Sequence, residues 1–398
     1  MKLSDEFSVP NLKDKSSAKI PKNILILGLV SFLTDASSDM IYPVLPLFLS
    51  DVLGSSTLFI GLIEGVAEST ASILKIFSGW LSDRLGKRKF LVGLGYGLSA
   101  MGKPILSVVT AGWHVLLLRF ADRFGKGVRT SPRDALIADF SPEERRGLSY
   151  GFHRAMDSAG AVVGPLLAFL FLPLVSENYR ILFLIASVPA MLAALILVLF
   201  VKERKRLKDK VISLAKPKLS RFDPKFKIFL LGVTIFTLGN SSDAFLFLRA
   251  RGLNIDLVYI PILWLVLNLV YALVALPAGA LSDRIGRKNL IISGLLAYTL
   301  VYLGFAFATR SSQVWILFGI YGLYYGLANG TMRAYVADLV KEERRASAFG
   351  VYHGVVGLTA LPASLIFGWL WQSAGVSVAF GFGAGLAFLA LLIFKVGL

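Results

Sequence analysis

Long apolar segments recur along almost the whole chain, and they constrain its fold more than any other feature. A helix needs about 20 mostly apolar residues to cross the roughly 30 Å hydrocarbon core of a bilayer. Lipid offers an open backbone no hydrogen-bond partners, so each crossing segment must be a helix. We predict an all-α membrane protein with twelve transmembrane helices in the 398-residue sequence. Their approximate spans are 23–50, 57–82, 89–110, 112–138, 147–172, 180–201, 227–251, 256–282, 289–309, 312–338, 346–372 and 376–396.

The composition agrees with lipid as the main solvent, because 56% hydrophobic residues do not fit a soluble surface. The formal charge of +17 raises the question of nucleic-acid binding. Most Lys and Arg, however, lie in residues 1–22 and in the connections after even-numbered helices. The opposite side carries Arg180, Arg249, Arg251 and Arg310. By the positive-inside rule we expect a multi-pass protein of the cell (inner) membrane, with both termini cytoplasmic and no nucleic-acid partner.

A short loop sequence occurs twice in the chain. The first copy, Gly79–Arg88, reads GWLSDRLGKR, and the second copy, Gly279–Lys288, reads GALSDRIGRK. The segment Ser37–Asp39 likewise recurs as Ser241–Asp243. Duplication of this kind is common in membrane transporters, where each copy forms one half of the protein. The positions shared by the two loops are Gly79, Asp83, Arg84 and Gly86 in the first and Gly279, Asp283, Arg284 and Gly286 in the second.

The repeat divides the chain into two similar halves. We predict a cytoplasmic tail over 1–22, a six-helix bundle over 23–201, a basic cytoplasmic linker over 202–226 and a second six-helix bundle over 227–398. Both halves begin on the same side of the membrane, so the two bundles are parallel repeats related by an axis along the membrane normal. We expect the protein to be a monomer.

The doubled loop resembles the signature loop of the major facilitator superfamily, and the resemblance covers nearly the whole chain. It implies two six-helix bundles that move a solute by alternating access. In that family the loop aspartate holds the two halves in one conformation, which would be the role of Asp83, with Arg133 as its partner. For the basic loop residues, retention of the loop in the cytoplasm is an equal alternative. The conformational switch implied by the resemblance comprises Gly79, Asp83, Arg84, Gly86, Arg88, Arg133, Asp283 and Arg284.

Two further segments resemble motifs of the same family. Gly160, Gly164 and Pro165 match the start of its antiporter motif, although Ala168 and Phe169 replace the terminal glycines. This resemblance implies antiport and efflux. Close helix packing at the glycines would explain the same residues. Arg119, in the fourth predicted helix, resembles the arginine that the family associates with proton coupling, but the glycines after it are spaced differently.

Many charged residues lie within predicted helices, mostly in the first half. A charge at the bilayer centre costs about 2.5–3.5 kcal/mol on insertion scales, so these groups should face a wet cavity or one another. Proton coupling, substrate binding and a static salt-bridge network remain open for each of them. Our candidates for coupling are Asp35, Asp39, Glu64, Glu68 and Arg119. Arg123 and Lys126, which lie on the same helical face as Arg119, are candidates for binding an anionic group.

The second half has few buried charges and many aromatic residues, which favours a wall that contacts substrate. Its candidates for the substrate cavity are Asp243, Asn268, Tyr325, Asn329, Arg333 and His353. For single tyrosines, packing or anchoring at the membrane interface is the alternative.

The chain lacks the signatures of other functional classes. It has no cysteine, which excludes disulfides and thiolate metal sites, and it has no phosphate-binding loop motif. We therefore expect no enzymatic activity, no cofactor and no resident metal. The leading hypothesis is a secondary transporter for a small organic solute, with an anionic solute as one option and protons exchanged for it. An uptake symporter or uniporter, a lipid translocator and a transporter of metals or metal chelates are the alternatives, followed by a receptor or an enzyme.

Overall fold

The computed structural model describes residues 20–85, 87–142, 145–203, 222–341 and 344–397, apart from the side chains at positions 76, 79, 80, 83, 283 and 346. The side chains of Asp83 and Asp283, the whole of Gly86 and most of the predicted linker therefore lie outside the described residues. In the described part the chain folds into helices and contains no strand.

The first half contains six membrane-spanning segments, the first of which is interrupted. They are α1 (Lys22–Ile41) continued by α2 (Leu45–Leu47) and the π-helical turn η2 (Phe48–Val52), α3 (Thr57–Leu85), α4 (Arg88–Leu106), α5 (Gly112–Phe140), α6 (Arg146–Leu174) and α7 (Tyr179–Phe200). We call the end of the molecule at which α1 begins the terminal end, and the opposite end the distal end.

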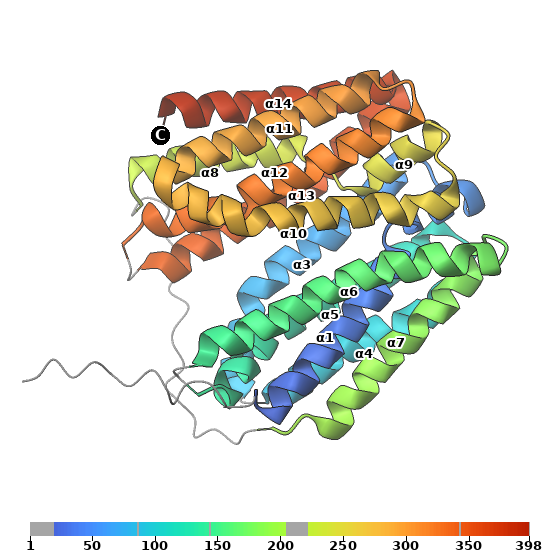
Figure 1. Cartoon of the computed structure of the whole chain (residues 1–398), viewed down its shortest axis with the longest axis vertical. Coiled ribbons are helices and arrows are strands. Elements are labelled where there is room, and N and C mark those ends of the chain that lie inside the picture. Colours follow the sequence, from blue (N-terminus) through green and yellow to red (C-terminus); the bar gives the residue numbers. More distant parts are fainter. Residues whose placement is uncertain (1–19, 86, 143–144, 204–221, 342–343, 398) are drawn as a thin grey trace, which may run out of the picture.

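The second half repeats this order, and its first segment is again interrupted. Its elements are α8 (Pro224–Gly239) continued by α9 (Ala244–Gly252), the 3₁₀ turn η5 (Leu257–Tyr259) continued by α10 (Ile260–Ile285), α11 (Arg287–Phe307), α12 (Ser311–Asp338), α13 (Arg345–Ala374) and α14 (Val376–Gly397). Figure 1 shows the two sets of helices as two bundles that approach each other at the distal end, with α3 between them.

Nine of the described helical segments are long and apolar enough to cross a membrane. The other three long helices are α4, α5 and α12. Helix α5 is less apolar because it carries Arg119, Arg123 and Lys126 on one face. Helix α12 is less apolar because it carries tyrosines and small residues. The predicted all-α fold of twelve spans in two bundles is confirmed, with helix boundaries within a few residues of the predicted ones.

The breaks in the first and seventh spans were not predicted, and both follow from local sequence. Pro43 has no N–H to donate to the carbonyl of Asp39 one turn earlier, and α1 ends at Ile41. After Gly239 the sequence Asn-Ser-Ser-Asp offers side-chain oxygens that compete for backbone hydrogen bonds. The carbonyl of Gly239, freed at this break, accepts a hydrogen bond from Tyr298 Oη at 3.0 Å. Such a partner is needed because lipid provides none.

The bundles meet where α3 packs against α13 through glycines. A Cβ atom added to Gly61 would lie 2.3 Å from the carbonyl oxygen of Ser364, and one on Gly368 would lie 2.5 Å from that of Thr57. Ser69 donates across the same boundary to the carbonyl of Gly357 at 2.6 Å. Only glycine allows backbones to approach this closely. The contact runs along the distal part of α3, which agrees with the approach of the bundles in Figure 1.

Candidate functional site

An ion pair between α3 and α5 lies at the boundary between the two bundles. Arg119 donates from Nη2 to the carboxylate oxygens of Glu64 at 2.7 and 2.8 Å, and from Nε at 3.1 Å. The side chain of Glu64 is 2% exposed and that of Arg119 is 11% exposed. Ser242, in the second bundle, donates to Glu64 Oε2 at 3.4 Å. One carboxylate therefore joins an arginine of its own bundle to a hydroxyl of the other.

The cations next to this pair are incompletely compensated. Arg123 Nη2 lies 3.7 Å from Glu68, and its Nε lies 4.0 Å from Asp122. This Nε is buried and has no hydrogen-bond acceptor among the described residues. Within the described ranges, neither Lys75 nor Lys126 has a carboxylate oxygen within 4.0 Å. The region thus holds positive groups with unused donors, which is the arrangement that binds an anion.

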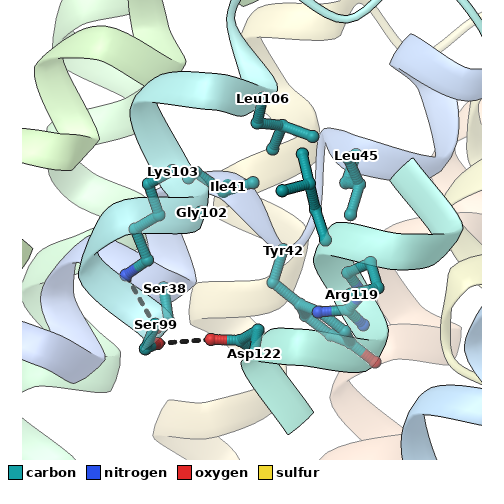
Figure 2. A pocket seen from close by; sticks show the side chains of 11 residues that line it. Ser38, Ile41, Tyr42, Leu45, Ser99, Gly102, Lys103, Leu106, Arg119 and Asp122 are labelled. Carbon is teal, nitrogen blue, oxygen red and sulfur yellow. Dashed lines mark hydrogen bonds between the residues drawn. The ribbon is translucent and has the colours of Figure 1, made fainter. Parts of the chain in front are cut away.

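A cavity of about 50 Å³ lies between α1, α4 and α5. Figure 2 shows Lys103 directed toward Ser38, and Ser99 joined to Asp122, with Tyr42 and Arg119 on the opposite wall. Lys103 Nζ donates to Ser37 Oγ at 2.6 Å and to Ser38 Oγ at 3.1 Å. The residues that line the cavity are Ser38, Ile41, Tyr42, Leu45, Ser99, Gly102, Lys103, Leu106, Leu118, Arg119 and Asp122.

In the second bundle, Asp243 lies in the break between α8 and α9. Its carboxylate accepts hydrogen bonds from Tyr321 Oη at 2.7 Å and from Tyr325 Oη at 3.1 Å. Tyr302 Oη lies 3.4 Å from Ser241 Oγ in the same break. The partners of this carboxylate are neutral hydroxyls, whereas Glu64 and Glu68 of the first bundle face arginines.

Helix α6 packs closely against α1 beside two predicted coupling residues. A Cβ atom on Gly160 would lie 2.6 Å from the carbonyl oxygen of Phe32, and one on Gly164 would lie 3.0 Å from the Cβ of Asp39. Asp39 accepts a hydrogen bond from Trp264 Nε1 of the second bundle at 3.4 Å. The glycines of the antiporter-like segment thus allow α6 to pack closely against the part of α1 that contacts the other bundle.

Comparison with known proteins identifies the family of this two-bundle architecture. The sequence model of the Major Facilitator Superfamily matches residues 27–270 and, in a second match, 228–397. The chain belongs to the major facilitator superfamily. An uncharacterised MFS-type transporter of Methanocaldococcus jannaschii is 38% identical over 96% of both chains.

Two other similarities show how widely this superfamily varies. A multidrug resistance protein of Escherichia fergusonii, MdtG, is 26% identical over 80% of this chain and 79% of its own. The crystal structure of the nucleoside transporter NupG superposes with a TM-score of 0.76, at 14% identity, over 94% of this chain and 98% of that one. The structural similarity shows the shared fold. The family match and the similarity to an MFS-type transporter make the chain a multi-pass membrane protein of a transporter family.

The superfamily loop at the terminal end positions an ion pair in each half. Arg88, at the start of α4, contacts Asp139 of α5, and Arg287, at the start of α11, lies 2.7 Å from Asp338 of α12. The two loops therefore correspond at Arg88 and Arg287, which lie 199 positions apart, whereas Asp83 and Asp283 lie 200 positions apart in the sequence. Arg287 has a specific partner in addition to any role in topology. Arg133 donates to Asp134 at 3.1 Å, and its predicted contact with Asp83 lies outside the described residues.

The remaining candidates of the second half are dispersed. Asn268 Nδ2 donates to the carbonyl of Trp264 within α10 at 2.9 Å. Arg333 donates to Asn329 one turn earlier on α12, at 3.2 Å to the carbonyl and 3.3 Å to Oδ1. His353 lies against the ring of Tyr352, with 5.2 Å between centroids. None of these three contacts connects directly to the Asp243 site.

Sequence reasoning missed several residues of the site. Tyr42 lies with its ring 5.0 Å from Trp264 and 5.8 Å from the guanidinium of Arg119. Ser242 donates a hydrogen bond to Glu64, and Tyr321 donates one to Asp243. The one available signal was that Ser242 belongs to the repeated Ser-Ser-Asp segment. No signal distinguished Tyr42 or Tyr321 from the other aromatic residues. Among the described residues, no group of three or more His, Cys, Asp or Glu side chains is arranged to hold a metal ion.

Proposed function

We propose that this transporter exports a small organic solute bearing an anionic group, by alternating access and in exchange for protons. The observation that carries the proposal is the set of cations at the bundle boundary, Arg123, Lys126 and Lys75, whose charges and donors the neighbouring carboxylates do not fully use. We further propose a monomer in the cell (inner) membrane with both termini cytoplasmic, in line with the placement of its Lys and Arg.

The anionic group of the solute would lie at Arg123 and Lys126. A buried guanidinium N–H without an acceptor costs free energy, so a bound carboxylate, phosphate or sulfonate would stabilise the site. Among the described residues Lys126 has no carboxylate oxygen within 4.0 Å, so an anion at this position would meet a cation that is not already paired. Both residues lie on α5 one turn apart and face the same region.

Proton exchange would act through Glu64 and Arg119. Protonation of Glu64 would remove its charge, release Arg119 from the bidentate contact and alter the hydrogen bond from Ser242. Because Ser242 belongs to the other bundle, this change reaches the boundary that must open and close in alternating access. The similarity to a multidrug resistance protein supports export as the direction.

The test uses 4-toluenesulfonate, an anion that does not cross lipid and stays charged at every working pH. Purified protein in liposomes loaded with this probe and a trapped pH indicator should acidify the lumen when the outside is made acidic, while the probe leaves. Lys126→Met should strongly reduce both signals at probe concentrations near the wild-type affinity. Lys225→Met, which removes an exposed lysine at the start of α8, should leave them intact.

Three outcomes would contradict the proposal in different ways. Loss of probe that ignores the pH gradient indicates a uniporter. Exit of protons together with the probe indicates a symporter. Absence of any sulfonate flux, with flux of a neutral or cationic solute, rejects the anionic class.

A further inference from the structure

Asp243 differs from Glu64 and Glu68 at the bundle boundary because its partners carry no charge. Glu64 and Glu68 pair with arginines, whereas Asp243 accepts hydrogen bonds from two tyrosine hydroxyls. In the described part of the chain no Lys, Arg or His nitrogen lies within 4.0 Å of its oxygens. A carboxylate without a cation is costly within a membrane, and such residues mark functional sites.

The carboxylate is half-buried and has aromatic neighbours on several helices. The rings of Tyr321 and Tyr325 lie 5.1 Å apart, and Tyr271 of α10 lies 6.1 Å from Tyr325. A carboxylate among aromatic faces is the combination that binds an ammonium group, through the ion pair and through cation–π attraction.

The position of this carboxylate links it to the proposed anion site. Asp39 accepts a hydrogen bond from Trp264, whose ring packs against Tyr42. Ser242, the residue before Asp243, donates to Glu64, which pairs with Arg119 of α5. The charged groups of α5 and the segment that carries Asp243 are therefore linked across the boundary through Glu64 and Ser242.

We propose that Asp243, with the rings of Tyr321 and Tyr325, binds an ammonium group of the transported solute. The solute is then a zwitterion, with its anionic group at Arg123 and Lys126 and its cationic group in the second bundle. This inference rests on the proposed function for the anionic end and adds the chemistry of the other end. A zwitterion would bridge the two bundles, so its binding would favour conformations in which they are close at this level.

The test compares three probes built on one ring: 4-toluenesulfonate as the anion, 4-methylbenzylamine as the cation and 4-(aminomethyl)benzenesulfonate as the zwitterion. Binding to the purified full-length protein is measured by calorimetry at pH 7. We expect the zwitterion to bind about tenfold more tightly than the anion, because it adds an ion pair and cation–π contacts. Asp243→Asn should remove this tenfold difference and leave the affinity for the anion unchanged.

Further variants separate the two ends of the solute. Lys126→Met should weaken the anion and the zwitterion and leave the cation unaffected. Tyr325→Phe keeps the carboxylate but removes one hydrogen bond, so a smaller loss of a few-fold is expected for the cation and the zwitterion. This variant provides the answer if Asp243→Asn does not fold, because unchanged binding of the cation in Tyr325→Phe would overturn the inference.

The outcomes for the two proposals are distinct. Equal binding of the anion and the zwitterion to the unmodified protein overturns the zwitterion inference and leaves the proposed anion export standing. Binding of the cation without the anion supports Asp243 as an ammonium site and rejects the proposed function. A tenfold difference that persists in Asp243→Asn overturns the inference. The inference is also overturned if Asp243→Asn changes only the pH dependence of anion binding, because Asp243 would then be a proton site.

Discussion

The two bundles share their helix order but place different chemistry at corresponding positions. Helices α4 and α5 begin at Arg88 and Gly112, and α11 and α12 begin at Arg287 and Ser311, so corresponding residues in these helices lie 199 positions apart. At this spacing four residues of the charged and polar network in the first bundle correspond to tyrosines in the second. The pairs are Ser99 with Tyr298, Lys103 with Tyr302, Asp122 with Tyr321 and Lys126 with Tyr325.

The contacts are partly conserved through this exchange. Lys103 donates to the serines of the first Ser-Ser-Asp segment, and the hydroxyl of Tyr302 lies 3.4 Å from Ser241 of the second. A tyrosine hydroxyl can therefore replace an ammonium group as the partner of a broken helix. The exchange removes a charge that a proton or an anion would sense and adds an aromatic face. At these four positions the first bundle therefore holds charged and polar groups, whereas the second holds aromatic rings with hydroxyls.

The largest effect is expected from the ion pair of the first bundle. Arg119→Ala leaves the charge of Glu64 buried without a cation, which costs about 3–5 kcal/mol. We expect a large drop in thermal stability and loss of coupled transport. In the second bundle the corresponding Phe318→Leu removes part of a buried ring and should cost about 1–2 kcal/mol. Thermal unfolding in detergent measures both, and equal effects would remove the distinction between the bundles.

A control separates charge from packing in this experiment. The double variant Arg119→Ala with Glu64→Gln has no unpaired charge, so it should recover much of the stability of the single variant. It should still fail to couple transport to protons. Restored coupling would show that Glu64 does not carry the proton.

The second effect concerns helix packing beside Asp39. Gly164 of α6 corresponds to the buried Ala363 of α13, and a Cβ atom on Gly164 would lie 2.5 Å from the carbonyl oxygen of Ala36. We expect Gly164→Ala to cost about 1–3 kcal/mol through overpacking and to slow transport. Ala363→Gly should cost about 1 kcal/mol or less, from helix propensity. Thermal stability and initial rates of sulfonate flux are measured for both variants. Wild-type stability and flux in Gly164→Ala would exclude close packing as the reason for a glycine at this position.

The third effect compares Lys126 with Tyr325 directly. Lys126→Met should weaken binding of 4-toluenesulfonate about tenfold, because an uncompensated charge in a region of low dielectric is removed. Tyr325→Phe should leave binding of this anion within about twofold, because its hydroxyl is bound to Asp243. Calorimetric titration measures both affinities. A larger loss in Tyr325→Phe would place the anion in the second bundle and reverse the assignment of the two ends.

The smallest effect is expected at the terminal end, where the two bundles are most alike. The side chains of Arg88 and Asp139 are 10% and 9% exposed, whereas those of Arg287 and Asp338 are 26% and 50% exposed. Because exposed pairs contribute about 0–1 kcal/mol, Asp338→Asn should change stability little, and Asp139→Asn should change it more. Thermal unfolding measures both changes and tests this order.

A second measurement follows the opening of the molecule. The chain has no native cysteine, so a single cysteine introduced at either end can report the opening of that end through its rate of labelling by a thiol reagent. Equal labelling in both variants would limit these pairs to a structural role.

Sequence reasoning predicted the elements of the site better than their partners. It identified Glu64, Arg119, Arg123 and Asp243 because a charge within an apolar helix is costly wherever it lies. It paired Asp83 with Arg133, a contact outside the described residues. The structure shows that Arg88 corresponds to Arg287, since the first loop has one additional residue before its helix begins.

The twelve spans and the duplication follow from the sequence alone, because the thickness of the bilayer and the cost of an open backbone fix the length and type of each segment. The tertiary structure alone decided that Ser242 reaches Glu64 and that Trp264 reaches Asp39. It also placed two tyrosines on Asp243. These contacts join segments up to 225 residues apart, and they depend on how glycine-lined helices pack across the boundary. Helical periodicity gives the direction of a side chain on its own helix, but it does not give the neighbour that this side chain meets.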